Sequence, residues 1–166
     1  KLFENLVYFL KRIMPACDET GINMAIHPDD PPWDMFGFPR IITGKDSYNR
    51  MINAVPNLHN GFTFCTGSLG AGRDNDLKEM AKAYANRIYF AHIRQLKYDN
   101  ETDFTEAGHL TSTGDLDIFG IVKALVQGGF TGYVRPDHGR NIWDEDGKPG
   151  YGLYDRALGA CYLNGL

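Results

Sequence analysis

The chain has 166 residues, of which 43% are hydrophobic and 23% are charged, and its formal net charge is −4. This length is enough for one domain with a substantial core, so residues 1–166 are expected to form a single domain. An acidic chain without a run of Lys or Arg argues against a nucleic-acid partner, because phosphate groups require a basic face. No apolar stretch approaches the roughly 20 residues of a membrane-spanning helix, so we expect no membrane partner either.

Three cysteines, Cys17, Cys65 and Cys161, lie far apart in the sequence, and none belongs to a CxxC pair. An odd number of widely spaced cysteines does not predict a disulfide framework. We therefore expect a reducing, cytoplasmic location.

Apolar runs typical of strands alternate with apolar residues at helical spacing, which is typical of βα units. In chain order we expect a helix over about residues 2–20, a strand over 22–27, a helix over 46–54, a strand over 61–65, a helix over 77–84, a strand over 88–94, a helix over 118–126, a strand over 133–137 and a helix over 153–163.

Local signals predict details of these elements. Pro15 predicts a bend in the first helix, and the glycines within 67–72 predict a loop. A long polar loop is expected from residue 95 to about 113. The expected helix N-caps are Asp46 or Ser47, Asp74 and Asp115. The side chains expected to shape the loop after the first strand are Asp29, Asp30 and Trp33.

Each predicted strand has large apolar residues at one parity and small or polar residues at the other. In the first strand Met24 and Ile26 alternate with Ala25 and His27. Because side chains alternate between the two faces of a strand, one face can pack on helices while the other points into a barrel. Strands of an open doubly wound sheet are apolar on both faces. The pattern therefore favours an α/β fold of the (β/α)8 TIM-barrel class.

A residue that can bind a metal stands at the C-terminal end of each predicted strand, on the inward parity. The four residues are His27, Cys65, His92 and Asp137. Active sites of (β/α)8 barrels form at this end of the strands, and two imidazoles, a thiolate and a carboxylate suit a divalent transition metal. Any one of them alone is more often structural. Their coincidence predicts a metal site, whose metal the donor set leaves open because Zn²⁺ also fits.

Six segments that span most of the chain resemble the mannonate dehydratase family. They are Met24–Pro32, Phe64–Ser68, Phe90–Arg94, Phe104–His109, Arg135–Arg140 and Pro149–Gly159. The resemblance implies a xylose-isomerase-like barrel that dehydrates D-mannonate to 2-keto-3-deoxy-D-gluconate in hexuronate (glucuronate) catabolism. It also implies Mn²⁺ or Fe²⁺ as the cofactor, bound by the four residues at the strand ends.

Family members are roughly twice as long, and a barrel needs eight strands. The chain is therefore expected to supply the last four βα units, the C-terminal half of a barrel, with the other strands preceding Lys1. The 166 residues alone are expected to be inactive, and the partners expected are the sugar acid and either a second copy of the chain or the missing N-terminal half.

The resemblance also implies that His138 and Tyr151 carry out the proton transfers and that Asp137 belongs to the catalytic set as a metal ligand. We interpret Tyr151 as the base and His138 as the acid, although the reverse assignment stays open. Structural pairing with Asp137 is the alternative for His138. Loop packing is the alternative for Tyr151. Tyr154 is the residue that would replace it, and it is also a candidate for substrate binding.

Several polar side chains near these residues are candidates for substrate binding. Arg94 lies two residues beyond His92 on the same strand face, from which a guanidinium can hold the substrate carboxylate in a bidentate pair. Arg135 is a second candidate, and a structural ion pair is the alternative for both. Glu106 and His109, in the long polar loop, are expected to contact sugar hydroxyls unless that loop is merely solvated.

Two other functions remain open on the sequence. One is a metal-dependent sugar isomerase or epimerase of the same barrel superfamily, although those enzymes usually bind metal through carboxylates and histidines without a cysteine. The other is an inactive half-barrel that serves as a binding or scaffold fragment.

Overall fold

A parallel four-stranded sheet forms the centre of the computed structural model, which describes residues 1–166. The strands follow the order β1-β2-β3-β6, with all neighbours parallel. Their bounds are β1 Met24–Ile26, β2 Asn60–Cys65, β3 Ile88–Ile93 and β6 Tyr133–Pro136. Each strand is followed by at least one helix, which confirms the predicted α/β class with βα units.

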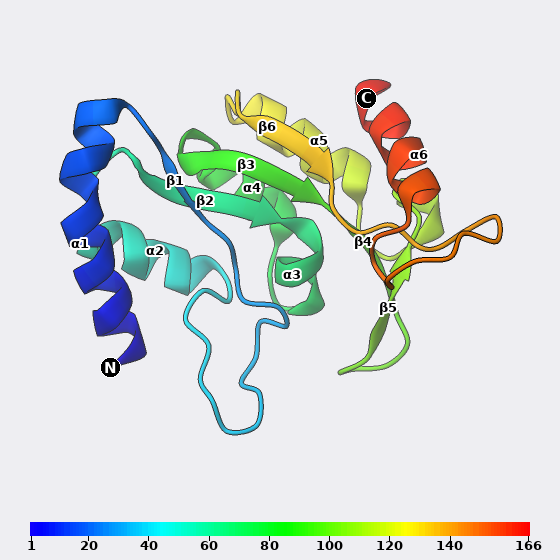
Figure 1. The fold of residues 1–166 in the computed structure, drawn as a ribbon, viewed down its shortest axis with the longest axis horizontal. Coiled ribbons are helices and arrows are strands. Elements are labelled where there is room, and N and C mark those ends of the chain that lie inside the picture. Colours follow the sequence, from blue (N-terminus) through cyan, green and yellow to red (C-terminus); the bar gives the residue numbers. More distant parts are fainter.

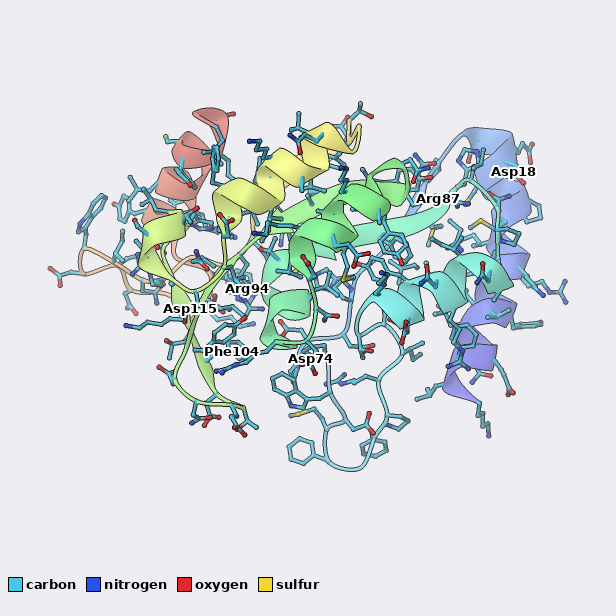
Figure 2. The ribbon with its side chains drawn as sticks, turned by 180° about the vertical axis from the view of Figure 1, so that it is seen from behind. Asp18, Asp74, Arg87, Arg94, Phe104 and Asp115 are labelled. Atoms are coloured by element: carbon cyan, nitrogen blue, oxygen red, sulfur yellow. The ribbon has the colours of Figure 1, made fainter.

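Helices cover one face of the sheet, with α4 and α5 side by side against it (Figures 1 and 2). The helices are α1 Leu2–Thr20, α2 Lys45–Ala54, α3 Thr66–Ala71, α4 Leu77–Ala83, α5 Ile118–Gln127 and α6 Leu153–Asn164, with short 3₁₀ turns η1 Ala85–Arg87 and η2 Thr111–Thr113. No helix combines the length and apolar character that a membrane crossing requires.

Two of the expected loops contain regular structure. The segment after β2, predicted as a glycine loop, is the buried helix α3. Its glycines permit close packing: a Cβ on Gly67 would lie 2.2 Å from the Arg94 Cδ atom. The predicted polar loop after β3 contains an antiparallel hairpin of β4 (Gln95–Tyr98) and β5 (Phe104–Ala107). The prediction missed this hairpin because only one end of it, with Gln95, Leu96 and Ala107, is buried.

Each acidic residue that was predicted as a helix N-cap lies two residues from the observed N-cap. Asp76 and Asp117 accept the N-terminal hydrogen bonds of α4 and α5, in place of Asp74 and Asp115. The N-cap of α2 is Gly44, in place of Asp46 or Ser47, and the Ser47 hydroxyl accepts a hydrogen bond from its N–H. Pro15 lies inside α1, which runs on without a break to Thr20.

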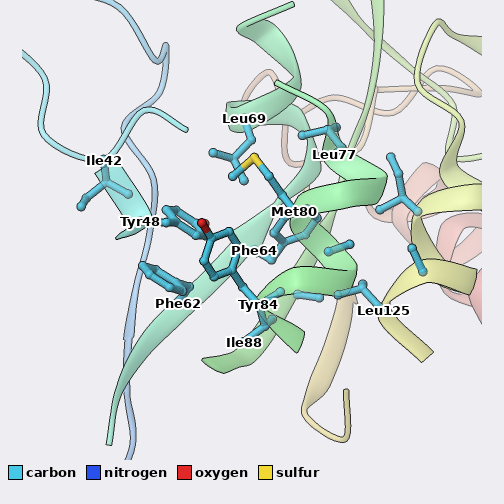
Figure 3. Packing of buried hydrophobic residues seen from close by; sticks show 14 of the residues in the cluster. Ile42, Tyr48, Phe62, Phe64, Leu69, Leu77, Met80, Tyr84, Ile88 and Leu125 are labelled. Carbon is cyan, nitrogen blue, oxygen red and sulfur yellow. The ribbon is translucent and has the colours of Figure 1, made fainter. Parts of the chain in front are cut away.

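The main core lies between the sheet and the helices, and Figure 3 shows its packing. The rings of Tyr48 from α2 and Phe62 from β2 stack with centroids 3.6 Å apart, and Tyr84 packs edge-on against both. Such aromatic pairs contribute about 0.5–1.5 kcal/mol beyond the burial of their surface. This core fixes one face of β2, so the alternate residues of the strand point to the other face.

The opposite face of the sheet is largely bare. A hollow of about 380 Å³ lies on it, lined by Asn23, Ala25, Tyr89, Phe90 and Tyr133. Tyr133 is 83% exposed although it lies in the sheet. The edge strands β1 and β6 each pair on one side only, so each has unpaired backbone groups that can accept another strand.

We predict that residues 1–166 expressed alone will aggregate, dimerise or lack a cooperative unfolding transition, because two open edges and a bare sheet face invite association. Analytical ultracentrifugation and thermal unfolding would measure this. A monomer with a sharp two-state transition would contradict the half-barrel interpretation.

Candidate metal centre

Strand register brings the predicted metal ligands together at one end of the sheet. A bulge between Phe62 and Thr63 shifts the pairing of β2 with β3, so that Cys65 lies directly beside His92. On the other side of β3, the Asp137 N–H donates to the Ile93 carbonyl and continues the pairing with β6. His27 follows β1 by one residue. The four residues therefore meet at the C-terminal ends of the four parallel strands, as predicted.

The donor atoms of these side chains converge. One ligand atom from each of His27, Cys65 and His92 lies within 4.8 Å of the others, and His27 Nε2 is 3.2 Å from His92 Nδ1. The Asp137 carboxylate closes the group, with Oδ1 3.4 Å from His92 Nδ1 and Oδ2 3.7 Å from the Cys65 Sγ atom. Such a cluster of nitrogen, sulfur and oxygen donors can hold a metal ion.

Hydrogen bonds around the cluster leave its metal-binding atoms pointing inward. The His27 Nδ1 atom lies 2.7 Å from the Pro28 carbonyl oxygen, which can only accept, so Nδ1 carries the proton and the Nε2 lone pair faces the cluster. This arrangement is typical of metal-ligating histidines. The Cys65 sulfur accepts hydrogen bonds from the Ser68 hydroxyl at 3.1 Å and from the Ser68 N–H at 3.5 Å, which orient it.

The charges and protonation states of these side chains are also compatible with a bound cation. Burial, with a smaller contribution from the Asp137 carboxylate, raises the pKa of the Cys65 thiol to about 12. Burial lowers the pKa of His92 to about 4, against the opposing effect of Asp137, so this imidazole is neutral near pH 7 as a ligand must be. A divalent cation among these groups would favour the thiolate and offset the negative charges facing each other. The residues therefore fit a divalent transition metal.

A second set of charged side chains borders the cluster. His138 Nδ1 lies 2.7 Å from Glu106 Oε1, and His138 Nε2 lies 3.8 Å from the Asp137 carboxylate. The Arg94 guanidinium, which Figure 2 labels beside the hairpin, pairs with Glu106 and with Asp30 at 2.6 Å each. Arg94 is only 4% exposed. The expected binding of a substrate carboxylate by Arg94 remains a prediction. Both terminal nitrogens of Arg94 already pair with carboxylates of the protein.

The remaining predicted residues lie around this border. Arg135 pairs with Asp137 at 2.5 Å. Tyr151 is half exposed, and backbone hydrogen bonds between Gly139 and the segment Gly150–Gly152 hold it near His138. Cations flank its ring, with Lys148 Nζ 5.0 Å from the ring centroid. Tyr154 is half exposed and packs against Trp143 rather than against the ligand cluster.

His109 occupies a different environment. It is 3% exposed, its ring nitrogens make no hydrogen bond, and it packs so closely on α6 that a Cβ on Gly159 would lie 2.5 Å from its Nδ1 atom. Burial lowers its pKa, so the ring is neutral near pH 7. Its expected contact with sugar hydroxyls remains a prediction.

Sequence reasoning missed two residues that support the cluster. Ser68 orients the Cys65 sulfur, and its position in the first turn after the strand was the available signal. Asp30, expected only to shape its loop, pairs with the buried Arg94. The shaping role belongs to Asp29, whose carboxylate accepts hydrogen bonds from the Ile41 and Ile42 N–H groups.

The fold and the converging strand ends define a class, the xylose-isomerase-like TIM barrels. A xylose isomerase domain protein from Alicyclobacillus acidocaldarius superposes with a TM-score of 0.70 at 13% identity, over 99% of this chain and 58% of that one. The IOLI protein, in a structure described as having a binding zinc atom, superposes at 0.60 and 14% identity, over 95% of this chain and 50% of that one. These likenesses concern the fold alone, and they confirm the predicted class.

Closer relatives identify the family. The family model for D-mannonate dehydratase (UxuA) matches residues 1–166. Mannonate dehydratase of Thermotoga maritima is 55% identical over 100% of this chain and 47% of that protein, and mannonate dehydratase 1 of Bacillus licheniformis is 57% identical over 99% and 45%. The crystal structure of mannonate dehydratase from Streptococcus suis serotype 2 superposes with a TM-score of 0.94 at 48% identity, over 99% of this chain and 48% of that one.

The chain therefore belongs to the D-mannonate dehydratase family, and the predicted resemblance is confirmed. It spans about half the length of the curated relatives it matches.

We predict that Cys65→Ser in the complete protein weakens metal binding by on the order of 10²-fold, because a thiolate is replaced by a neutral hydroxyl. Metal content after dialysis would measure this. Cys161→Ser, at an exposed cysteine, is the matched control and should retain its metal. Full occupancy in the Cys65→Ser protein would exclude Cys65 as a ligand.

Proposed function

We propose that the complete protein dehydrates D-mannonate to 2-keto-3-deoxy-D-gluconate, as a hydro-lyase of hexuronate catabolism. The observation that carries this proposal is the cluster of His27, Cys65, His92 and Asp137 in a chain about 55% identical to mannonate dehydratases. A cysteine ligand also distinguishes the cluster from the carboxylate-rich sites usual in isomerases of the same fold.

The four clustered residues are proposed to hold Mn²⁺ or Fe²⁺. Dehydration of an aldonate removes the weakly acidic proton at C2 and expels the hydroxyl at C3. The cation, when bound, supplies a Lewis acid that stabilises negative charge developing on the substrate carboxylate. The chain itself must then provide a base near C2 and an acid near C3.

His138 and Tyr151 are the proposed proton-transfer residues. His138 follows the ligand Asp137 directly, which fixes its backbone at the border of the cluster, and its Nε2 atom faces that carboxylate. Tyr151 lies on the segment that pairs with Gly139 and is exposed enough to meet a substrate. We assign Tyr151 as the base and His138 as the acid. Arg94, Arg135, His109 and Tyr154 remain proposed substrate contacts.

The rest of the barrel is proposed to come from four further βα units that pair with the open edges β1 and β6, or from a second copy of the chain. Those units would supply the substrate contacts from the other strand ends. We also propose a cytoplasmic location, which suits the free thiol of Cys65.

We predict that the full-length protein consumes D-mannonate anaerobically once Mn²⁺ or Fe²⁺ is added, and that chelation abolishes the reaction. Formation of 2-keto-3-deoxy-D-gluconate is the measurement, with Cys65→Ser as the negative control. Absence of product with either cation would reject the proposed function.

We predict that His138→Asn and Tyr151→Phe each keep the metal and bind D-mannonate with little change, while turnover falls roughly 10²–10⁴-fold. Exchange of the C2 hydrogen in D₂O separates the roles when deprotonation precedes loss of the hydroxyl. The variant without the acid should still exchange, and the variant without the base should not. Near-wild-type turnover in both variants would remove these residues from the mechanism.

A further inference from the structure

Glu106 lies on β5, outside the main sheet, yet its side chain reaches the border of the metal centre. Both carboxylate oxygens have partners there. Oε1 is 2.7 Å from His138 Nδ1 and 2.6 Å from Arg94 Nη2, while Oε2 is 3.1 Å from Arg94 Nε. The side chain is about one-quarter exposed, so Glu106 faces the protein more than solvent.

We propose that Glu106 is the positioning residue of His138: it accepts the hydrogen bond from Nδ1–H and so makes Nε2 the atom that takes up and donates the transferred proton at the metal centre. This inference rests on the proposed function, in which His138 transfers a proton. An imidazole with its proton on Nδ1 has an unprotonated Nε2, and that atom is the one that faces Asp137, at 3.8 Å.

The charge state of Glu106 supports this direction of the hydrogen bond. Burial alone would raise the pKa of its carboxyl, but hydrogen bonds from His138 and Arg94 hold the pKa below its usual value. An ionised carboxylate can only accept. The proton between the two side chains therefore belongs to His138 Nδ1, and the same carboxylate stabilises the imidazolium that forms whenever Nε2 takes up a proton.

Arg94 fixes Glu106 in turn. Its Nε and Nη2 atoms both donate to the carboxylate, and its Nη1 atom donates to Asp30 at 2.6 Å. The backbone of Arg94 is itself held, because its N–H donates to the Thr66 hydroxyl at 2.7 Å. A bidentate pair of this kind restricts both side chains. The end of β3 thus determines where the hairpin places Glu106, and Glu106 determines how His138 is turned.

This role differs from the sugar contact that the sequence indicated for Glu106. A residue that binds the substrate's hydroxyls equally in the ground state and the transition state changes KM, whereas a residue that orients an acid or base changes kcat. The two roles can therefore be separated by kinetics and by the protonation pattern of His138.

The first experiment reads the imidazole directly in the full-length, metal-free protein labelled with ¹⁵N-histidine. NMR at alkaline pH, where imidazoles are neutral, distinguishes Nδ1–H from Nε2–H, and His138→Asn assigns the signal. We expect Nδ1–H in the wild type and in Glu106→Gln, whose amide oxygen still accepts, and a shift of the proton to Nε2 in Glu106→Ala. An unchanged His138 signal in Glu106→Ala would overturn the proposal.

The second experiment measures turnover of D-mannonate by the metal-loaded, full-length variants. Glu106→Ala should lower kcat by roughly 10²-fold or more with KM and metal content nearly unchanged, and Glu106→Gln should recover part of the loss. Glu101→Ala, in the exposed turn of the same hairpin, is the matched control and should behave as wild type. A raised KM with unchanged kcat in Glu106→Ala would overturn the proposal in favour of a sugar contact.

These two readouts keep the proposals distinct. A wild-type protein that fails to consume D-mannonate rejects the proposed function, while the NMR signal of His138 still decides whether Glu106 sets its tautomer. Thermal unfolding of Glu106→Ala and Glu106→Gln establishes that the compared proteins are folded.

Discussion

The register between β2 and β3 is the constraint on which the candidate metal centre depends. Side chains alternate between the two faces of a strand, so a shift of one residue would turn Cys65 away from His92. The bulge at Phe62 and Thr63 sets that register, and the stack of Phe62 on Tyr48 holds the outer face of β2 against the helices. Core packing on one side of the sheet thus places the thiol on the other side.

Beyond the sheet, the buried guanidinium of Arg94 holds the surrounding segments in place. Arg94 leaves the end of β3 and binds carboxylates from two separate segments, the loop after β1 through Asp30 and the hairpin through Glu106. A buried guanidinium requires such partners, since an unpaired charge in this position would be costly. Both segments are therefore fixed to the end of β3.

The sequence predicted the features that depend on periodicity and spacing. The alternation of strands and helices and the four ligand-type residues at equivalent strand ends needed only local patterns. The hairpin of β4 and β5 could not be predicted, because just one end of it is buried and its alternation is weak. Helix α3 was missed because its glycines serve close packing, Gly67 against Arg94 and Gly70 against Leu116, rather than a turn. The partners of Arg94 depend on contacts between segments far apart in the chain, which no local pattern contains.

The buried, protonated thiol of Cys65 has a consequence for the durability of the protein. Oxidants and alkylating reagents attack thiolates, and a thiol with a pKa raised to about 12 supplies almost none at neutral pH. Without a bound cation, the Cys65 thiol is therefore expected to react slowly with peroxide. A cation that bound here would displace the thiol proton, so acid conditions would oppose its binding. The protonated sulfur of Cys65 thus resists oxidation, whereas the deprotonated sulfur is the form that binds a metal.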